Sequence, residues 1–355
     1  MEAQETPAEL GFRWPAEWEP HAATWLAWPH NRETWPGCLD EAERGFVAMV
    51  RALEPHELVC VNVGDAALEA RARRVLTAGG VDPAGSGAGH GVVFHRIPTD
   101  DAWIRDHGPS FVVRDLDGVR ETALVDFGFD AWGGKYPPWD HDAAVPEGMA
   151  RGLRMRRFVA PGVLEGGSID GNGAGTVITT EECLLHENRG GRTREQMEAL
   201  LAAYLGTRRV IWLGRGIAGD DTDGHVDDVA RFVAEDTVVT VVPADARHPD
   251  APALLENERR LRAARSADGK PLRIATLPVA PVQRSPAGEP LPASYANFYL
   301  ANGICLVPTF RAPEDARALS ILAELLPGRH VVGIDARTLV MGLGAVHCLT
   351  QQQPC

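Results

Sequence analysis

Residues 193–206 read TREQMEALLAAYLG, and this stretch is the clearest sign of how the chain folds. Its composition and spacing are typical of an α-helix. Similar helical stretches begin at Pro252 and Pro313, so that three helices start at intervals of about 60 residues. Two more helices are predicted, from Leu39 and, with a weaker pattern, near His141. Five helices suggest five units of a structural repeat, and an ordinary mixed sheet is the alternative.

Short runs rich in β-branched residues lie between the helices and predict strands at 57–63, 175–180, 237–242 and 304–308. Strands that alternate with helices indicate an α/β protein. Stretches rich in glycine and proline predict surface loops at 77–91, 244–252 and 281–293. No change of composition separates these parts. We therefore expect residues 1–355 to form one domain, with 1–10 as a flexible N-terminus.

The composition of the 355 residues excludes several classes of protein. Hydrophobic residues make up 45% and charged residues 24%, which is typical of a globular protein and not of a disordered, collagen-like or coiled-coil chain. A net charge of −14 without a Lys/Arg-rich run argues against binding of nucleic acid. We found neither a signal sequence nor an apolar run long enough to cross a membrane, so we expect a soluble, cytoplasmic protein. The six cysteines lack CxxC spacing, which favours reduced thiols.

The stretch Asp220–Phe232 (DDTDGHVDDVARF) is the densest group of polar residues. Acids and one histidine recur at every second position, which on an extended backbone places them on one face: Asp221, Asp223, His225 and Asp227. An imidazole among carboxylates is compatible with a general acid/base, a metal site or a surface turn. A calcium loop does not fit, because the terminal glutamate is missing.

The C-terminal stretch Gly342–Pro354 (GLGAVHCLTQQQP) favours a catalytic role for these residues over a surface turn. Small residues before Cys348 allow the backbone to approach a planar group closely. A single cysteine with a histidine and acids elsewhere in the chain is a candidate nucleophile, and an inert buried thiol is the alternative. The many acids suit a guanidinium group, which is planar, permanently charged and donates paired N–H groups to carboxylates.

Seven motifs, in this order, resemble the family of agmatine deiminases and Porphyromonas-type peptidylarginine deiminases: DAWIRDHGP, AWGGKYPPWD, LEGGSID, CLLHENR, DDTDGHVDDVARF, PASYANFY and AVHCLTQQQP. The resemblance runs from about Gly11 almost to the C-terminus. It implies the pentein fold, a five-bladed α/β propeller of ββαβ units around a central tunnel. It also implies a hydrolase that converts a guanidino group to a ureido group without a metal or organic cofactor. For agmatine the product is N-carbamoylputrescine, an intermediate of putrescine biosynthesis.

The resemblance assigns a role to each matching position. Cys348 matches the nucleophile, His225 the general acid/base, and Asp106 and Asp227 the carboxylates that hold the guanidinium. Two tryptophans lie in matching motifs and are expected to bind substrate, and a further acid completes the set: Trp103, Trp132 and Glu165. The family pattern changes at residues 186–191, where we expect a loop to differ without affecting the chemistry.

Other activities remain open at this point. The enzyme could act on peptidyl-arginine or on another small guanidine instead of agmatine, or it could be an amidinotransferase. A metallohydrolase using residues 221–228 and a non-catalytic polyamine-binding protein are the remaining alternatives. The expected partner is a small cationic guanidino compound, and a chain of this length is expected to form a homo-oligomer.

Overall fold

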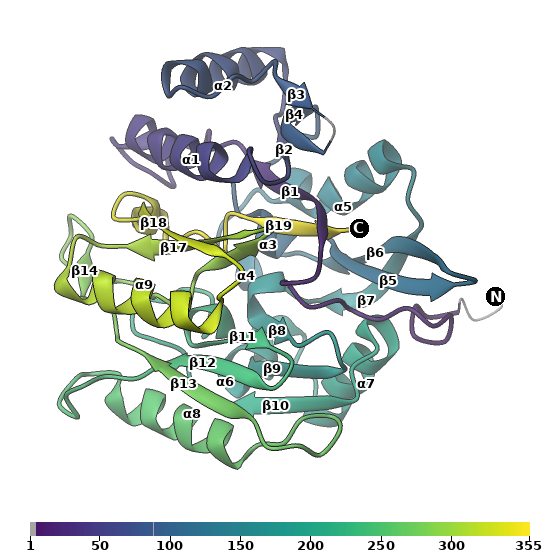
Figure 1. Ribbon diagram of the computed structural model, residues 1–355, viewed down its shortest axis with the longest axis vertical. Helices are drawn as coiled ribbons and strands as arrows, with labels where there is room; N and C mark the ends of the chain where they lie inside the picture. Colours follow the sequence, from purple (N-terminus) through teal and green to yellow (C-terminus); the bar gives the residue numbers. More distant parts are fainter. Residues whose placement is uncertain (1–4, 88) are drawn as a thin grey trace.

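Several small sheets, each accompanied by a helix, make up the protein in the computed structural model, which describes residues 5–87 and 89–355 (Figure 1). The first sheet joins the two ends of the chain. Its strands run in the order β19 (Gln351–Pro354), β1 (His21–Ala27), β2 (Leu58–Asn62), β4 (His90–His95) and β3 (Ser86–Gly87). Helices α1 (Leu39–Leu53) and α2 (Ala66–Ala78) connect its parallel strands.

Each of the following sheets contains three strands and one connecting helix. The first contains β5 (Ser110–Leu116), β6 (Val119–Gly128) and β7 (Arg157–Val163), with α5 (Asp140–Leu153). The next contains β8 (Ile169–Gly171), β9 (Thr176–Thr180) and β10 (Arg209–Leu213), with α7 (Arg194–Leu205). The third of these sheets contains β11 (Ala230–Ala234), β12 (Thr237–Val241) and β13 (Arg273–Leu277), with α8 (Ala251–Ala263). The last contains β16 (Tyr299–Ala301), β17 (Ile304–Thr309) and β18 (His330–Asp335), with α9 (Pro313–Leu325).

These sheets share one connectivity. In each, the first two strands are antiparallel neighbours, and the helix then leads to a third strand parallel to the second. A helical crossover is the usual way to join parallel strands. Figure 1 shows α2 at the top with α1 below it, α9 on the left, α8 at the bottom and α7 on the right, with most of the strands between them.

Short elements fill the spaces between the sheets. They are the hairpin β14 (Gln283–Arg284) and β15 (Pro290–Leu291), the one-turn helices α3 (Ile104–His107), α4 (Ala131–Gly134) and α6 (Glu181–Leu184), and the 3₁₀ turns η1 (Gly166–Ser168), η2 (Glu187–Arg189), η3 (Val226–Asp228) and η4 (Leu339–Gly342). Most of the active-site candidates lie on these short elements or directly beside them, so the sheets serve as a rigid frame for them.

The structure confirms the α/β class and the predicted helices and strands. Helix α7, for example, begins with a capping box in which Thr193 and Gln196 exchange hydrogen bonds, and ends at Gly206 with φ of +68°. Helix α2 was not predicted, although Asp65 caps it by accepting from the N–H groups of Ala67 and Leu68. The predicted loop at 77–91 was therefore wrong at both ends, since α2 reaches Ala78 and strands β3 and β4 occupy its second part. Residue 88 of that stretch lies outside the described residues.

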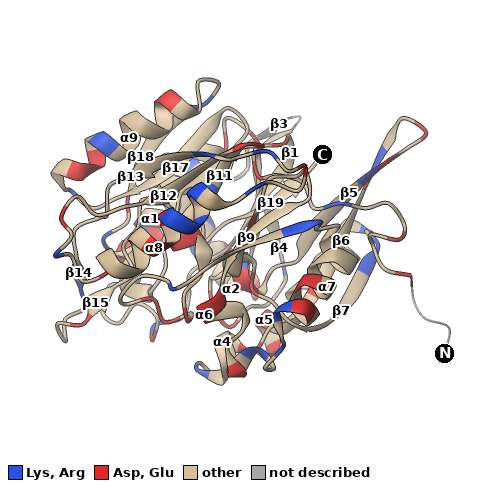
Figure 2. Cartoon of the chain, turned by 90° about the horizontal axis from the view of Figure 1, so that it is seen from below, with Lys and Arg blue, Asp and Glu red and all other residues tan. Residues whose placement is uncertain are grey.

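Two other predictions concern the ends and the surface of the chain. Of the N-terminal segment 1–10, residues 1–4 lie outside the described part, and the N–H of Ala8 donates to the carbonyl of Ala203 in α7 at 3.1 Å. Figure 2 shows acidic and basic residues interspersed along α5 and α9 and not gathered into a basic stripe. No helix among the described residues is long and apolar enough to cross a membrane.

Two glutamines of strand β19 allow a test of how much their hydrogen bonds stabilise the C-terminal end of the chain. Arg105 donates from Nη1 to Oε1 of Gln352 at 2.7 Å, whereas Trp25 donates from Nε1 to Oε1 of Gln353 at 2.8 Å. Both glutamines are buried. Because a bond to a charged group is the stronger, Gln352→Ala should lower the free energy of unfolding by about 1.5–3 kcal/mol and Gln353→Ala by about 0.5–1.5 kcal/mol. Urea unfolding of the two variants measures both values, and a larger loss for Gln353→Ala would contradict this account.

Candidate active site

The loop between η4 and β19 positions Cys348. Asn297, which precedes β16, accepts from the N–H of His347 at 2.9 Å through Oδ1 and donates from Nδ2 to Sγ of Cys348 at 3.1 Å. The loop passes close to the ring of Trp103, because a Cβ placed on Gly344 would lie 2.4 Å from that ring. The structure therefore confirms that glycine before Cys348 lets the backbone approach a planar group.

His225 is held by a turn and not by a strand. Asp220 accepts through Oδ2 from the N–H groups of Gly224 at 3.1 Å and His225 at 2.8 Å. The prediction of an extended segment with alternate residues on one face was wrong, because Asp223 and Gly224 have φ of +65° and +92° and η3 follows. Only His225 and Asp227 of the four alternating residues enter the site. Asp221 and Asp223 instead contact Lys135.

Three functional atoms surround Gly167 in η1. A Cβ placed on this glycine would lie 2.7 Å from Nδ1 of His225, 2.9 Å from Oδ1 of Asp106 and 3.0 Å from Oδ2 of Asp227. A side chain at this position would therefore displace these groups. The sequence LEGGS thus supplies both Glu165 and the space in which the histidine and the two aspartates meet.

Asp106, on α3, accepts two hydrogen bonds. Its Oδ1 accepts from the N–H of Gly167 at 3.0 Å and its Oδ2 from Nε1 of Trp132 at 3.0 Å. Burial raises the pKa of Asp106 well above its ordinary value, and the nearby charges of Asp227 and Glu165 raise it further. A cation bound beside Asp106 would favour its ionised form.

Asp227 is connected to a buried charged network that the sequence did not reveal. Its Oδ2 lies 2.7 Å from Nδ1 of His347, and Nε2 of that histidine lies 2.9 Å from Oε2 of Glu17. Glu17 also forms ion pairs with Arg105 at 3.3 Å and Arg231 at 2.9 Å. Burial acts to raise the pKa of Asp227, but the hydrogen bond of His347 and the charges of His347, His225 and Arg231 together lower it. The His347–Cys348 dipeptide was the only sequence signal for this network.

Glu165 is fully buried beside Arg189. Nε of Arg189 donates to Oε1 of Glu165 at 3.0 Å, and Nη1 donates to Asp223. Burial raises the pKa of Glu165, although the charge of Arg189 opposes this. Arg189 belongs to the loop 186–191 that we expected to lie apart from the chemistry. Asn188 in the same loop donates to the carbonyl of Trp132 at 3.4 Å, so the loop supports two of the predicted site residues.

Trp103 and Trp132 are both buried, but they differ in their contacts. Trp132 donates to Asp106, as described above, and its ring packs edge-to-face on Phe129. Trp103 stacks at a tilt on Trp35, with ring centroids 5.5 Å apart. Trp132 therefore orients a predicted guanidinium-holding carboxylate, whereas Trp103 supports the loop that carries Cys348.

The protonation states of Cys348 and His225 follow from their burial. Burial raises the pKa of the Cys348 thiol well above its ordinary value, and the charges of Asp227, Asp228 and Asp106 add to the effect. Burial likewise lowers the pKa of His225 to about 3, although Asp227 opposes this. At neutral pH the free protein therefore holds a neutral thiol and a neutral imidazole. Burial is thus a larger cause of the shift in the thiol pKa than the nearby carboxylates.

Comparisons with known proteins show which family this chain resembles over almost its whole length. The model of the family described as Porphyromonas-type peptidyl-arginine deiminase matches residues 13–354. The agmatine deiminase of Ectopseudomonas mendocina is 38% identical over 374 residues, covering 98% of this chain and 97% of that protein. The agmatine deiminase of Pseudomonas putida is 37% identical, with the same coverage.

Solved structures of agmatine deiminases also resemble this chain over almost its whole length. The agmatine deiminase of Enterococcus faecalis superimposes with a TM-score of 0.90 at 31% identity, covering 99% of this chain and 98% of that one. A substrate-bound agmatine deiminase of C. jejuni superimposes with a TM-score of 0.84 at 26% identity, covering 96% of each chain.

The raised pKa of Cys348 can be measured by titration. Thiolate absorbance of the free protein, taken as the difference between wild type and Cys348→Ser, should show ionisation of this thiol only above its ordinary range, because burial disfavours the charged form. A difference titration that shows Cys348 already ionised below neutral pH would contradict the electrostatics described here.

Proposed function

This chain belongs to the Porphyromonas-type peptidyl-arginine deiminase family, and we propose that it is an agmatine deiminase. In this proposal it hydrolyses agmatine to N-carbamoylputrescine and ammonia, a step of putrescine biosynthesis. The relatives named agmatine deiminase support this substrate. The reaction cleaves a C–N bond of a linear amidine, so the protein is a hydrolase.

One observation carries the proposal: carboxyl groups gather around a buried cysteine and histidine. Asp106, Asp227 and Glu165 are each at most 4% exposed. Buried acids are costly without a partner, and a guanidinium offers them paired N–H donors and a positive charge. The hydrolysis of a neutral ester or peptide bond has no need of such a set. A planar cation is therefore the best match to the site.

The burial of the site favours a small substrate. Cys348 is 7% exposed and His225 1% exposed, so the reacting carbon must travel inward to reach them. A slender alkylguanidine can do so without moving a protein chain with it. This supports agmatine over peptidyl-arginine, which is the second candidate because of the family description.

The first half of the proposed reaction forms a covalent intermediate. Asp106 and Asp227 hold the guanidinium, whose charge favours ionisation of the thiol. Sγ of Cys348 attacks the guanidinium carbon as its proton passes to His225, and a C–S bond forms. His225 returns the proton to the departing nitrogen, the C–N bond breaks and ammonia leaves. An S-alkylthiouronium remains on Cys348.

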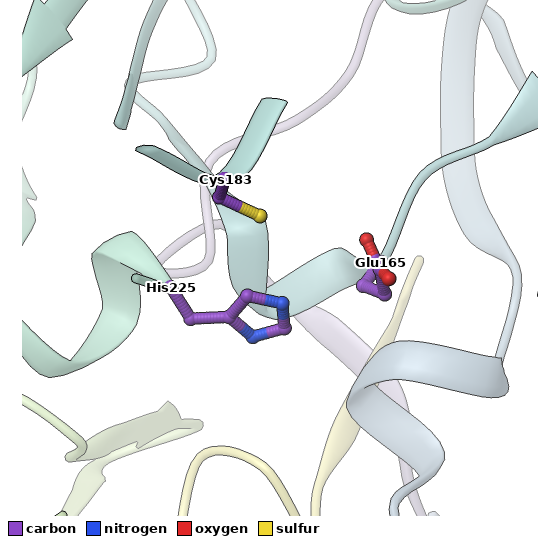
Figure 3. A group of neighbouring side chains, drawn as sticks. All are labelled: Glu165, Cys183 and His225. Carbon is purple, nitrogen blue, oxygen red and sulfur yellow. The ribbon is translucent and has the colours of Figure 1, made fainter. Parts of the chain in front are cut away.

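The second half hydrolyses this intermediate. His225 takes a proton from water, and the resulting hydroxide attacks the same carbon. The C–S bond breaks with its electron pair returning to sulfur, the hydroxyl proton is lost to solvent as the ureido C=O forms, and His225 returns its proton to the thiolate before the product is released. Glu165 lies within the same cluster as His225 (Figure 3) and positions it or the substrate.

We also propose that the sheets form a five-bladed propeller of ββαβ units within a single catalytic domain 1–355. The shared connectivity of the sheets and the pairing of β19 with β1 support this arrangement, since that pairing would complete a unit from both chain ends. We propose a cytoplasmic location, which is supported by six cysteines that are all free thiols.

The proposed activity can be tested with three substrates in parallel. Ammonia and ureido product should form from agmatine and not from arginine or a peptidyl-arginine, and Cys348→Ala should abolish both products because it removes the nucleophile. Turnover of peptidyl-arginine alone would replace the proposal by protein deimination. Ureido product without ammonia, or activity in Cys348→Ala, would contradict the mechanism.

Gly167 provides a test of the site geometry. Gly167→Ala should lower kcat by roughly 100-fold or more, because displacement of catalytic groups by about 1 Å costs that much. Gly152→Ala in α5 is the matched control, since a Cβ there would have no neighbour within 4 Å. Equal activity of the two variants would show that His225, Asp106 and Asp227 do not act together around Gly167.

A further inference from the structure

A second cysteine lies beside the catalytic histidine and has no part in the proposed reaction. Cys183, on α6, is fully buried, and its Sγ makes one long contact of 3.8 Å with the carbonyl of Thr222. Figure 3 shows its side chain with those of Glu165 and His225, which come from separate elements and converge. One potential ligand atom from each of the three lies within 4.8 Å of the other two.

Several of these atoms are free to bind a ligand. Among the described residues, neither ring nitrogen of His225 has a hydrogen-bond partner, and the same is true of Oε2 of Glu165. Both residues are at least nine-tenths buried. Unpaired polar atoms at such depth are costly and therefore point to a ligand. A guanidinium accounts for the carboxylate, but it does not account for a thiol at the same place.

A nitrogen, a sulfur and an oxygen donor together are typical of Zn²⁺. At zinc bond lengths a tetrahedral set spaces its ligand atoms roughly 3.5 Å apart, so modest movements of these side chains would complete it. Because neither ring nitrogen of His225 has a hydrogen-bond partner among the described residues, the ring can present a lone pair to an ion. Three protein ligands would leave a fourth position for water.

The surrounding charges balance such an ion. Arg189 is the cation that faces the cluster, and it already pairs with Glu165 and Asp223. With the thiol of Cys183 deprotonated, the two carboxylates and the thiolate carry three negative charges. Lys135 also pairs with Asp223, at 2.9 Å, so Arg189 is left to offset Glu165. A divalent ion would offset the thiolate and the neighbouring carboxylates Asp106 and Asp227. Compensation of buried negative charge is favourable, because an uncompensated charge is costly at this depth.

We propose that Glu165, Cys183 and His225 form a Zn²⁺ site whose occupation inhibits the enzyme. Binding releases the proton of Cys183 to solvent and engages the histidine that would transfer protons in catalysis. The inhibition rests on the proposed function, whereas the binding of the metal does not.

Co²⁺, a spectroscopic substitute for Zn²⁺, tests binding without reference to activity. In the metal-free Cys348→Ser protein, CoCl₂ should produce a thiolate-to-cobalt charge-transfer band that saturates at one ion per chain and disappears on addition of ZnCl₂. The band should be absent from the Cys183→Ser/Cys348→Ser double variant and present in Cys305→Ser/Cys348→Ser. No band in Cys348→Ser, or a band that persists without Cys183, would overturn the proposal.

Glu165→Gln in the Cys348→Ser background gives a second test that does not depend on replacing a buried cysteine. It should weaken Co²⁺ binding at least roughly tenfold, because it removes a charged ligand. Unchanged affinity would overturn the assignment of Glu165.

Inhibition is measured with Cys183→Ala, which should turn over substrate normally in the presence of EDTA. Half-inhibition by ZnCl₂ should require an at least roughly tenfold higher concentration than in wild type. Equal sensitivity would show that the metal acts elsewhere. Absence of turnover in wild type would instead disprove the proposed function, and the cobalt titration would still decide whether the site exists.

Discussion

The structure depends most on the placement of His347 between two buried carboxylates, Asp227 at 2.7 Å and Glu17 at 2.9 Å. Ionised carboxylates only accept hydrogen bonds, so both contacts are satisfied together when His347 carries a proton on each ring nitrogen. The same glutamate also pairs with Arg105 and Arg231, and these cations lower its pKa well below the ordinary value although burial opposes them. One network thus connects the N-terminal segment, α3 and β11 to the loop that carries the proposed nucleophile.

This network gives the two aspartates beside Gly167 different properties. His347 lowers the pKa of Asp227 against the effect of burial, whereas burial raises the pKa of Asp106. In the free protein the thiol of Cys348 and the imidazole of His225 are both neutral. The site is therefore arranged around a positive charge that it does not itself supply. In the proposed reaction a guanidinium would supply that charge and would favour ionisation of the thiol.

The sequence predicted the parts of this protein that depend on local patterns. Helix α1 begins at the predicted Leu39 and α7 one residue after the predicted Thr193, and the motifs indicated the candidate nucleophile and histidine. Helix α2, which buries Ala72 and Leu76, was missed, although α9 buries equally few residues and was predicted. Partners distant in the chain were also missed: Glu17 lies 330 residues from His347. The alternation of acids around His225 led to a wrong prediction of extended backbone, because positive φ angles at Asp223 and Gly224 turn the chain.

The central claim, that His347 keeps Asp227 ionised so that it can hold a guanidinium, is tested most directly by the pH dependence of kcat/KM for agmatine. The hydrogen bond and charge of His347 lower the pKa of Asp227 against the effect of burial, so their loss should raise it. The acid limb of the profile should therefore move to higher pH in His347→Asn, while the exposed control His330→Asn keeps the wild-type profile. A folded His347→Asn protein with an unchanged acid limb would contradict the account.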